Sequence, residues 1–177
     1  MSQTDKPAGP RWRAAWPKYQ PWVSLVLRLG LAAVALAASL PKLADLNNFR
    51  IAVAAFQVFP TAVSDLLAVA VPIIELTLGL ALLAGLLTRY AALLFGLIMV
   101  AFIVGIAQAW IRGLNIDCGC FGGGGELPPG QDTKYGLDIA RDVLFAAMAT
   151  CLVFWPNSPA SLDKVLRLEP VKKRADA

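Results

Sequence analysis

Four long apolar stretches alternate with short polar segments along this chain. Each is close to the roughly 20 mostly apolar residues that a helix needs to cross a bilayer. The pattern therefore predicts an all-α membrane protein, a bundle of four transmembrane helices. The predicted spans are Val23–Leu40, Leu66–Leu87, Ala91–Ile111 and Leu137–Trp155.

A shorter helix is predicted between the first two spans. Asp45 or a following Asn offers an N-cap, and apolar residues then recur at helical spacing up to Pro60. This segment is too short to cross the bilayer, so we expect an amphipathic helix at the interface or packed on the bundle. Its apolar positions are Phe49, Ala52, Val53 and Phe56.

The spans and their connections occupy nearly the whole chain, which predicts one membrane domain over residues 22–156. Residues 1–21 form a basic segment rich in Pro and Trp, and residues 157–177 form a basic tail. Residues 35–37 resemble a signal-peptide cleavage site, but Arg28 interrupts the apolar run, which favours an uncleaved helix. Thr88–Tyr90 leaves room only for a tight turn, so spans two and three should form an antiparallel hairpin.

Composition agrees with a membrane location, since 58% of the residues are hydrophobic and 16% are charged. Soluble domains carry about 45–50% apolar and about 25% charged residues. The net charge of +4 comes without a basic helix or an aromatic-basic motif, so we expect a lipid bilayer and no nucleic acid as partner.

Lysine and arginine predict the orientation, because they concentrate in cytoplasmic segments. Ten fall on one side of the predicted bundle: Lys6, Arg11, Arg13, Lys18, Arg89, Lys164, Arg167, Lys172, Lys173 and Arg174. Four fall on the other: Lys42, Arg50, Arg112 and Lys134. We therefore expect an inner or plasma membrane protein with both termini in the cytoplasm and the loop from Arg112 to Gly136 outside it.

Two of the three cysteines, Cys118 and Cys120, lie in that loop beside a run of glycines. Outside the cytoplasm thiols tend to pair, and a disulfide across one residue closes a small, strained and exchangeable ring. We expect exposed thiols on a loop that the glycines allow to move. Asp117 should raise the pKa of Cys118 and so favours Cys120 as the readier thiolate.

Other chemistry is limited by the absence of histidine, which excludes Ser-His and Cys-His nucleophiles and His-ligated metals. Two cysteines suit a soft metal such as Cu(I) but make an incomplete site, so no metal ligand is assigned. An incidental role for the cysteines stays open. Cys151 should lie about 20 Å deeper along the fourth span, as a small buried apolar residue.

Charged residues inside the predicted spans are a second group of candidates. Glu75 lies near the middle of span two, where a lone carboxylate costs about 2.5–3.5 kcal/mol. By depth, Arg141 is the nearest predicted partner and Lys42 is another, while Arg28 can snorkel from the inner side. These charges predict either an ion pair that fixes helix packing, or a proton path or quinone contact near the thiols.

The chain resembles the MauE/DoxX family of small redox-associated membrane proteins over about residues 24–155. The likeness rests on three stretches: Ser39–Phe49, Val71–Leu76 with Gly79, Leu83, Gly85, Thr88 and Arg89, and Asp117–Gly122. The cysteine motif is similar to the MauE branch. The resemblance implies a DoxX-like four-helix bundle that handles thiols outside the cytoplasm. MauE is associated with maturation of methylamine dehydrogenase, and DoxX relatives with thiosulfate–quinone and oxidative-stress systems.

The leading hypothesis is therefore a membrane thiol–disulfide redox component. In it, Cys118 and Cys120 exchange electrons with a secreted or thioredoxin-like protein, with quinone as a candidate acceptor. The alternatives are a non-enzymatic maturation factor for an extracytoplasmic enzyme of the methylamine dehydrogenase type and, ranked below it, a soft-metal carrier. Whether the chain is an enzyme stays open. Small residues would allow close helix packing, within the bundle or between copies of the chain: Gly79, Gly85, Gly96 and Gly105.

Overall fold

The computed structural model describes residues 11–121, 123–128, 132–159 and 161–165, with only the backbone for residues 11–18 and 164–165. The sequence places basic side chains in the N-terminal segment and in the tail. These side chains lie outside the part of the chain whose side chains the structure describes. The elements are α1 (Arg11–Ala44), α2 (Leu46–Ala55), α3 (Thr61–Ala84), α4 (Thr88–Ile111), β1 (Ile116–Asp117), β2 (Gly125–Glu126), α5 (Tyr135–Phe154) and α6 (Leu162–Val165).

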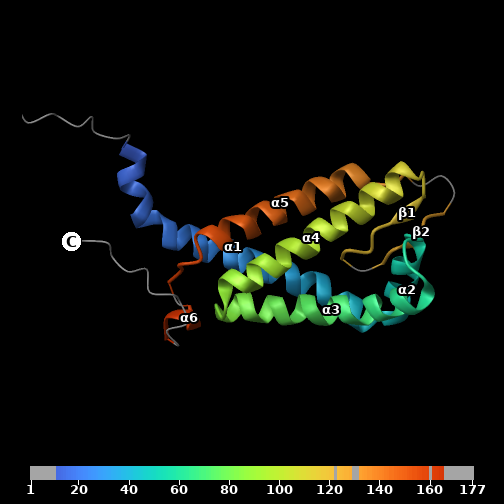
Figure 1. Cartoon of the computed structure of the whole chain (residues 1–177), viewed down its shortest axis with the longest axis horizontal. Helices are drawn as coiled ribbons and strands as arrows, with labels where there is room; N and C mark the ends of the chain where they lie inside the picture. The colour runs from blue at the N-terminus through green and yellow to red at the C-terminus, as the bar shows by residue number, and fades with distance from the viewer. Residues whose placement is uncertain (1–10, 122, 129–131, 160, 166–177) are drawn as a thin grey trace, which may run out of the picture.

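Four long helices form the bundle. Helix α1 packs against α3, α3 against α4, α4 against α5, and α5 against α1, so the four close a ring (Figure 1). The main core is made of aliphatic and small side chains with one phenylalanine, among them Leu31, Leu78, Leu82, Phe95 and Leu152. Many large apolar side chains point outwards from α1, α3, α4 and α5, as expected for helices surrounded by lipid.

The predicted class, an all-α membrane protein, is confirmed. Among the described residues, three helices are long and apolar enough to cross a membrane: Tyr19–Ala44 within α1, α3 and α4. Helix α5 has 20 residues but carries Asp138, Arg141 and Asp142 in its first half. It is a full member of the bundle, and its crossing of the membrane stays a prediction.

Two element boundaries differ from the sequence prediction. Helix α1 begins at Arg11, well before Val23, and its first turns lean away from the bundle (Figure 1). The hairpin of spans two and three is confirmed, but its turn lies at Gly85–Leu87, and Thr88 already begins α4. Gly85 ends α3 in the left-handed conformation, with φ of 67°, which is the usual role of glycine at a helix C-terminus.

Side chains from the C-terminal segment hold this turn. The carboxylate of Asp163 accepts hydrogen bonds from the backbone N–H groups of Leu87 (2.6 Å) and Thr88 (2.9 Å). It thereby supplies the cap that α4 lacks locally. The hydroxyl of Ser161 donates to the carbonyl of Gly85 at 2.8 Å. The segment after α5 is therefore fastened to the end of the bundle at which α3 and α4 meet.

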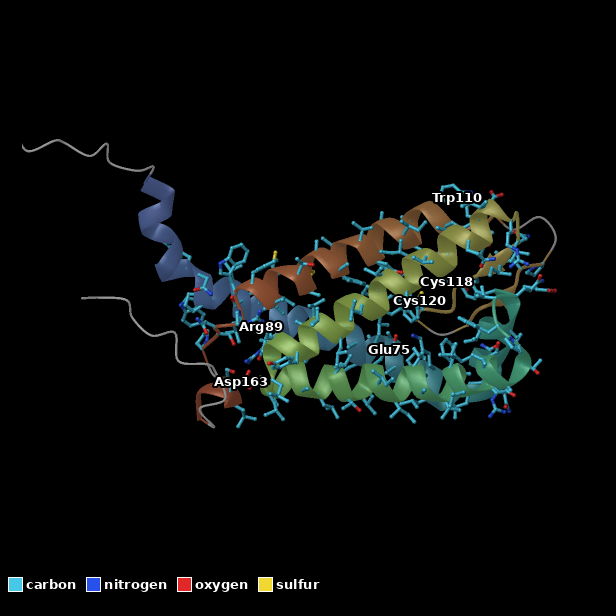
Figure 2. All side chains as sticks on the ribbon, viewed as in Figure 1. Glu75, Arg89, Trp110, Cys118, Cys120 and Asp163 are labelled. Carbon is cyan, nitrogen blue, oxygen red and sulfur yellow. The ribbon has the colours of Figure 1, made fainter. Side chains whose placement is uncertain are left out.

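Arg28 belongs to the same end of the molecule. Its side chain is buried, with 2% exposure, and its Nη1 donates to the hydroxyl of Ser158 at 2.9 Å. The expectation that Arg28 snorkels to the surface is therefore wrong, because the C-terminal segment covers it. Figure 2 shows Arg89 and Asp163 at this end, far along the bundle from Cys118 and Cys120.

Helix α2 lies at the opposite end, where it contacts α3 and the two short strands (Figure 1). Its start is capped as predicted, since the Asp45 carboxylate accepts a hydrogen bond from the N–H of Asn48 at 3.0 Å. The buried face consists of Phe49, Ala52 and Ala55. Of the two predicted locations, the structure has the helix packed on the bundle.

Two of the four glycines singled out in the sequence contribute to packing inside the bundle. A Cβ on Gly79 of α3 would lie 3.1 Å from Leu36 of α1, and a Cβ on Gly96 of α4 would lie 3.4 Å from the Cβ of Ala149 in α5. Small residues thus allow α1 to approach α3 and α4 to approach α5.

Candidate functional site

The loop between α4 and α5 folds back over one end of the bundle. Ile116–Asp117 pairs antiparallel with Gly125–Glu126, which makes a short β-hairpin with both loop cysteines between its strands. Tyr135, the first residue of α5, ties the hairpin down. Its hydroxyl donates to the carbonyl of Leu114 (2.6 Å) and accepts from the N–H of Ile116 (3.1 Å).

Glycines let the hairpin lie close against α2. Gly119 and Gly124 adopt φ of 65° and 98°, which favour glycine. A Cβ on Gly124 would lie 2.7 Å from both the Cβ of Ala52 in α2 and the Cα of Gly119. The sequence suggested that the glycine run serves loop movement. In the structure, these two glycines serve close packing of the hairpin on α2.

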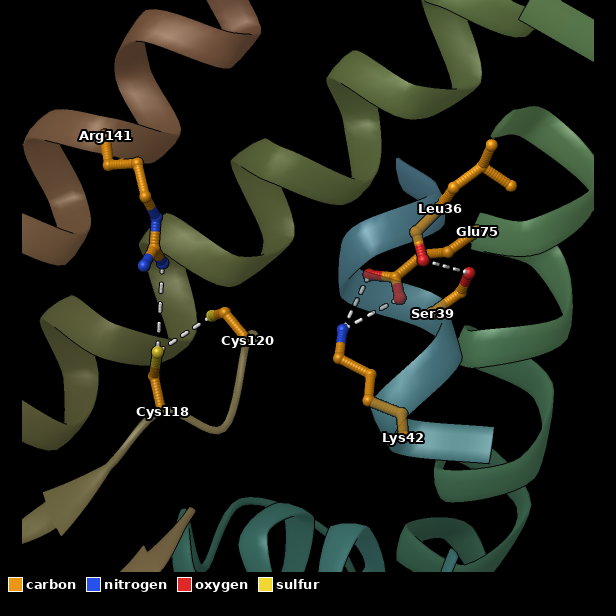
Figure 3. Close-up of polar contacts among 7 residues, drawn as sticks. All are labelled: Leu36, Ser39, Lys42, Glu75, Cys118, Cys120 and Arg141. Carbon is orange, nitrogen blue, oxygen red and sulfur yellow. Dashed lines mark hydrogen bonds and ion pairs between the residues drawn. The ribbon is translucent and has the colours of Figure 1, made fainter. Parts of the chain in front are cut away.

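The two loop thiols lie side by side inside this fold. The Sγ atoms of Cys118 and Cys120 are 2.8 Å apart, both cysteines are free, and each is 8% exposed (Figure 3). The expectation of exposed thiols is therefore wrong, because both cysteines pack in an apolar cluster with side chains of α2, α4 and α5. Cys151, which was expected to be a small buried residue, is also free and is half-buried on α5.

Arg141 of α5 organises the charges around the thiols. Its guanidinium contacts Asp138 and Asp142 at 3.1 Å each. It lies 3.9 Å from Cys118 Sγ (Figure 3). It also stacks on the Phe121 ring, 4.9 Å from the ring centroid. Asp138 and Asp142 were not identified as site residues from the sequence. The only signal was their spacing around Arg141 at the start of the fourth predicted span.

The surroundings make the two thiols unequal. The pKa of Cys118 is lowered, because its thiolate accepts a hydrogen bond from the Cys120 thiol and a further one from Arg141. The pKa of Cys120 is raised by that same hydrogen bond, by burial and by the negative charge on Cys118. The position of Arg141 favours Cys118 as the readier thiolate, whereas the sequence prediction favoured Cys120. That prediction considered only the neighbouring Asp117 and could not include the guanidinium that α5 brings to Cys118.

Glu75 finds its partner on α1. Lys42 Nζ donates to both carboxylate oxygens, Oε1 at 2.9 Å and Oε2 at 2.8 Å, and both side chains are fully buried. The same ammonium lies 5.1 Å from the ring centroids of Phe49 and Phe102. Of the two partners of Glu75 predicted by depth, Lys42 is confirmed. The prediction of Arg141 as its partner is wrong, because α5 turns Arg141 towards the thiols.

A small cavity borders Cys120 of the thiol pair and Glu75 of the ion pair. Cys120, Glu75 and Asp142 line it together with aromatic and aliphatic side chains, and its volume is about 10 Å³. That is the room of about one water molecule, so the cavity does not fit a quinone ring. Arg28 lies apart from both groups, at the other end of the bundle. Among the described residues, no three His, Cys, Asp or Glu side chains gather to hold a metal ion.

Fold and site together define a multi-pass membrane protein with a buried thiol pair and a guanidinium at one end of a helical bundle. The family described as "Methylamine utilisation protein MauE" matches residues 20–155. The chain is 31% identical over 134 residues to the methylamine utilization protein MauE of Paracoccus denitrificans, an alignment that covers 75% of this chain and 69% of that relative. The chain belongs to the MauE family. No solved structure matches it.

Replacing one member of the Lys42–Glu75 pair should destabilise the fold more than replacing both. Lys42→Met leaves a buried carboxylate without its cation, which we expect to cost about 3–5 kcal/mol of unfolding free energy. The double variant Lys42→Met/Glu75→Leu should recover most of this loss, because neither charge then remains buried. Denaturant unfolding of the purified protein in detergent measures both.

The exposed pair of Arg50 and Asp65, 3.8 Å apart, provides the control. Asp65→Asn should change the unfolding free energy by less than about 1 kcal/mol. A double variant at Lys42 and Glu75 that is no more stable than Lys42→Met would contradict the argument.

Adding a methyl group at Gly124 should open the hairpin. In a Cys151→Ser background, we expect Gly124→Ala to speed alkylation of Cys118 and Cys120 by a maleimide, because the new Cβ collides with Ala52 and with the Gly119 backbone. Gly123→Ala is the matched control. Its φ is also positive, at 76°, but the nearest atom to its Cβ would be 3.8 Å away. Equal alkylation rates in the two variants would show that hairpin packing does not protect the thiols.

Proposed function

We propose that this chain is a membrane thiol–disulfide redox component in which Cys118 and Cys120 interconvert between dithiol and disulfide. The observation that carries the proposal is the geometry of the pair. The two Sγ atoms lie 2.8 Å apart, and the Arg141 guanidinium lies 3.9 Å from one of them. A nearby cation stabilises a thiolate, and the thiolate is the reactive form in disulfide exchange.

In the proposed exchange, the Cys118 thiolate attacks one sulfur of a partner protein's disulfide. A mixed disulfide forms, and the partner's other sulfur leaves as a thiolate and takes up a proton. Cys120 then loses its proton and attacks Cys118 Sγ, which breaks the mixed disulfide and releases the partner's second thiolate. The partner gains two electrons and two protons, and the chain is left with a Cys118–Cys120 disulfide. The reverse sequence oxidises a partner dithiol.

The burial of both thiols bears on the kind of partner. Phe121, which is 40% exposed, lies next to the pair and stacks on Arg141. A partner that displaces Phe121 or lifts the hairpin would gain access to Cys118. A folded protein with its own surface thiols, such as a thioredoxin-like domain or a secreted substrate, can provide the contact energy for this opening.

The proposed orientation has both termini in the cytoplasm of a cell whose inner or plasma membrane holds the protein. Helix α5 is the fourth span, residues 22–156 are the membrane domain, and residues 1–21 and 157–177 are cytoplasmic. The uneven distribution of lysine and arginine supports this orientation. So does the fold, since Arg89 and the thiol hairpin are at opposite ends of the bundle (Figure 2).

The family points to the biological context. A relative named for methylamine utilization supports a role for this chain in such a system. The role that we propose there is maturation of an extracytoplasmic enzyme of the methylamine dehydrogenase type. A non-enzymatic maturation factor, with the hairpin as a docking site, is the second candidate. The specific observation in its favour is that both thiols are buried, as in a structural element.

Orientation can be tested with single exposed cysteines in a chain whose own cysteines are replaced by serine. We expect Glu126→Cys, on the hairpin, to react in intact cells with a membrane-impermeant maleimide. Arg89→Cys, on the first turn of α4, should react only after permeabilisation. Labelling of Arg89→Cys alone in intact cells would reverse the proposed topology.

Redox function can be tested by trapping. In a Cys151→Ser background, Cys120→Ser should accumulate a mixed disulfide through Cys118, because the resolving thiol is missing. Cys118→Ser should accumulate far less, because the remaining Cys120 thiol is buried and the Arg141 guanidinium contacts position 118. Acid quenching of cells, alkylation and non-reducing gels of the membrane fraction measure both.

The same experiment separates the two candidate functions. If neither variant traps a partner, and both support accumulation of the partner enzyme as well as wild type, the redox proposal is wrong and the docking role stands. A Cys118→Ser/Cys120→Ser variant that loses that accumulation, alongside a trapped species in Cys120→Ser, supports the redox role.

A further inference from the structure

One carboxylate oxygen near the thiols is buried without a hydrogen-bond partner. Asp142 on α5 is 2% exposed, and its Oδ1 accepts from Arg141 Nε at 3.1 Å. Its Oδ2 has no partner among the atoms that the structure describes. Burying a polar atom without a hydrogen-bond partner is unfavourable. The position of this oxygen therefore indicates that it binds a molecule or has a chemical role.

The cavity described above connects Asp142 to Cys120. Both residues line it, and its volume of about 10 Å³ is the room of about one water molecule. Glu75 lines the cavity too, but both of its oxygens already bind Lys42. Asp142 is therefore the carboxylate on this cavity with an oxygen available to accept a proton.

Closing a disulfide from two thiols releases one proton from each. Cys118 lies beside Arg141, which stabilises its thiolate. Cys120 has no such cation within hydrogen-bond distance in the described structure, and its burial disfavours the thiolate. At neutral pH, Cys120 must hand its proton to a base while its sulfur attacks, and a positioned carboxylate is a suitable general base.

We infer that Asp142 is the proton acceptor for Cys120, through a water molecule in the cavity that Cys120, Glu75 and Asp142 share. This inference rests on the proposed function. When Cys120 Sγ attacks Cys118 Sγ, the bond from Cys118 to the partner sulfur breaks, and the partner leaves with the electron pair. The Cys120 proton passes to Asp142 Oδ2. In the reverse reaction Asp142 returns it.

The charged and titratable groups around Asp142 come from α1, α3, the hairpin and α5, since α4 lines the cavity only with Phe95, Met99 and Phe102. Arg141 and Asp138 belong to its own helix, Cys118 and Cys120 to the hairpin. Lys42 on α1 and Glu75 on α3 form a closed pair. Because Arg141 binds Oδ1 of Asp142, Oδ2 is the carboxylate oxygen that accepts the proton.

The test uses the reduced, full-length Cys151→Ser protein in detergent and 5,5′-dithiobis(2-nitrobenzoic acid) as the disulfide. Attack by Cys118 releases one coloured thiolate, and closure by Cys120 releases a second, so stopped-flow absorbance separates the two steps. We expect Asp142→Asn to keep a first release at least as fast as in the parent and to slow the second on the order of 100-fold, the usual size of a general-base effect. The deficit should shrink as pH rises and hydroxide replaces the carboxylate.

Asp138→Asn is the matched control. Asp138 also contacts Arg141 at 3.1 Å, but it does not line the cavity, so the second release should keep its wild-type rate. A purely electrostatic effect of Asp142 has the opposite sign. Removing a negative charge lowers the pKa of a nearby thiol, so it would speed the second release.

Chemical rescue provides an independent readout. Asp142→Ala should also slow the second release, and added formate should restore it by placing a small carboxylate in the enlarged cavity. This arm keeps the test decisive if the Asn variant folds poorly, which its first release would reveal.

The outcomes separate the inference from the proposed function. A wild-type second release in Asp142→Asn, or an Asp142→Ala variant that formate does not rescue, overturns the role of Asp142 and leaves the redox proposal standing. If the parent protein releases no second thiolate and forms no Cys118–Cys120 disulfide, the proposed function itself fails.

Discussion

The arrangement of the thiol end depends on one buried ion pair. The Lys42 ammonium on α1 binds both oxygens of Glu75 on α3 and lies between the rings of Phe49 on α2 and Phe102 on α4. A single charged group thus contacts four helices. Because neither charge can stay buried alone without a large penalty, the pair sets how α1 and α3 face each other and where α2 sits. The thiol hairpin in turn packs on α2.

The opposite end is organised by another set of polar contacts. Asp163 caps α4 from a segment distant in sequence, Ser161 binds the Gly85 carbonyl, and Arg28 reaches Ser158. Between the two ends the core is almost wholly apolar. Apolar packing alone specifies helix rotation weakly, since large and small apolar side chains can be rearranged at moderate cost. Polar groups at both ends therefore give this bundle its register.

The sequence predicted much of this fold because its signals are local. Apolar stretches gave the long helices, Asp45 gave the cap of α2, and the short polar break after Leu87 gave the α3–α4 hairpin. The burial of Cys118 and Cys120 could not be predicted, since it depends on Gly124 meeting Ala52 of α2. Depth counting proposed both Arg141 and Lys42 for Glu75. It could not choose between them, because the choice depends on how α1 and α5 rotate about their axes.

The same rotation explains why the thiol pair is polarised in the proposed cycle. By turning Arg141 towards Cys118, α5 places a cation beside one sulfur, and one residue later it places the Asp142 carboxylate on the cavity beside the other. Two adjacent residues on one helix thus serve opposite requirements. One stabilises the thiolate that meets a partner, and the other can take the proton of the thiol that closes the disulfide. Electrons are then exchanged with the partner at the hairpin while the proton moves into the bundle, a division that two thiols on a free, solvated loop would not impose.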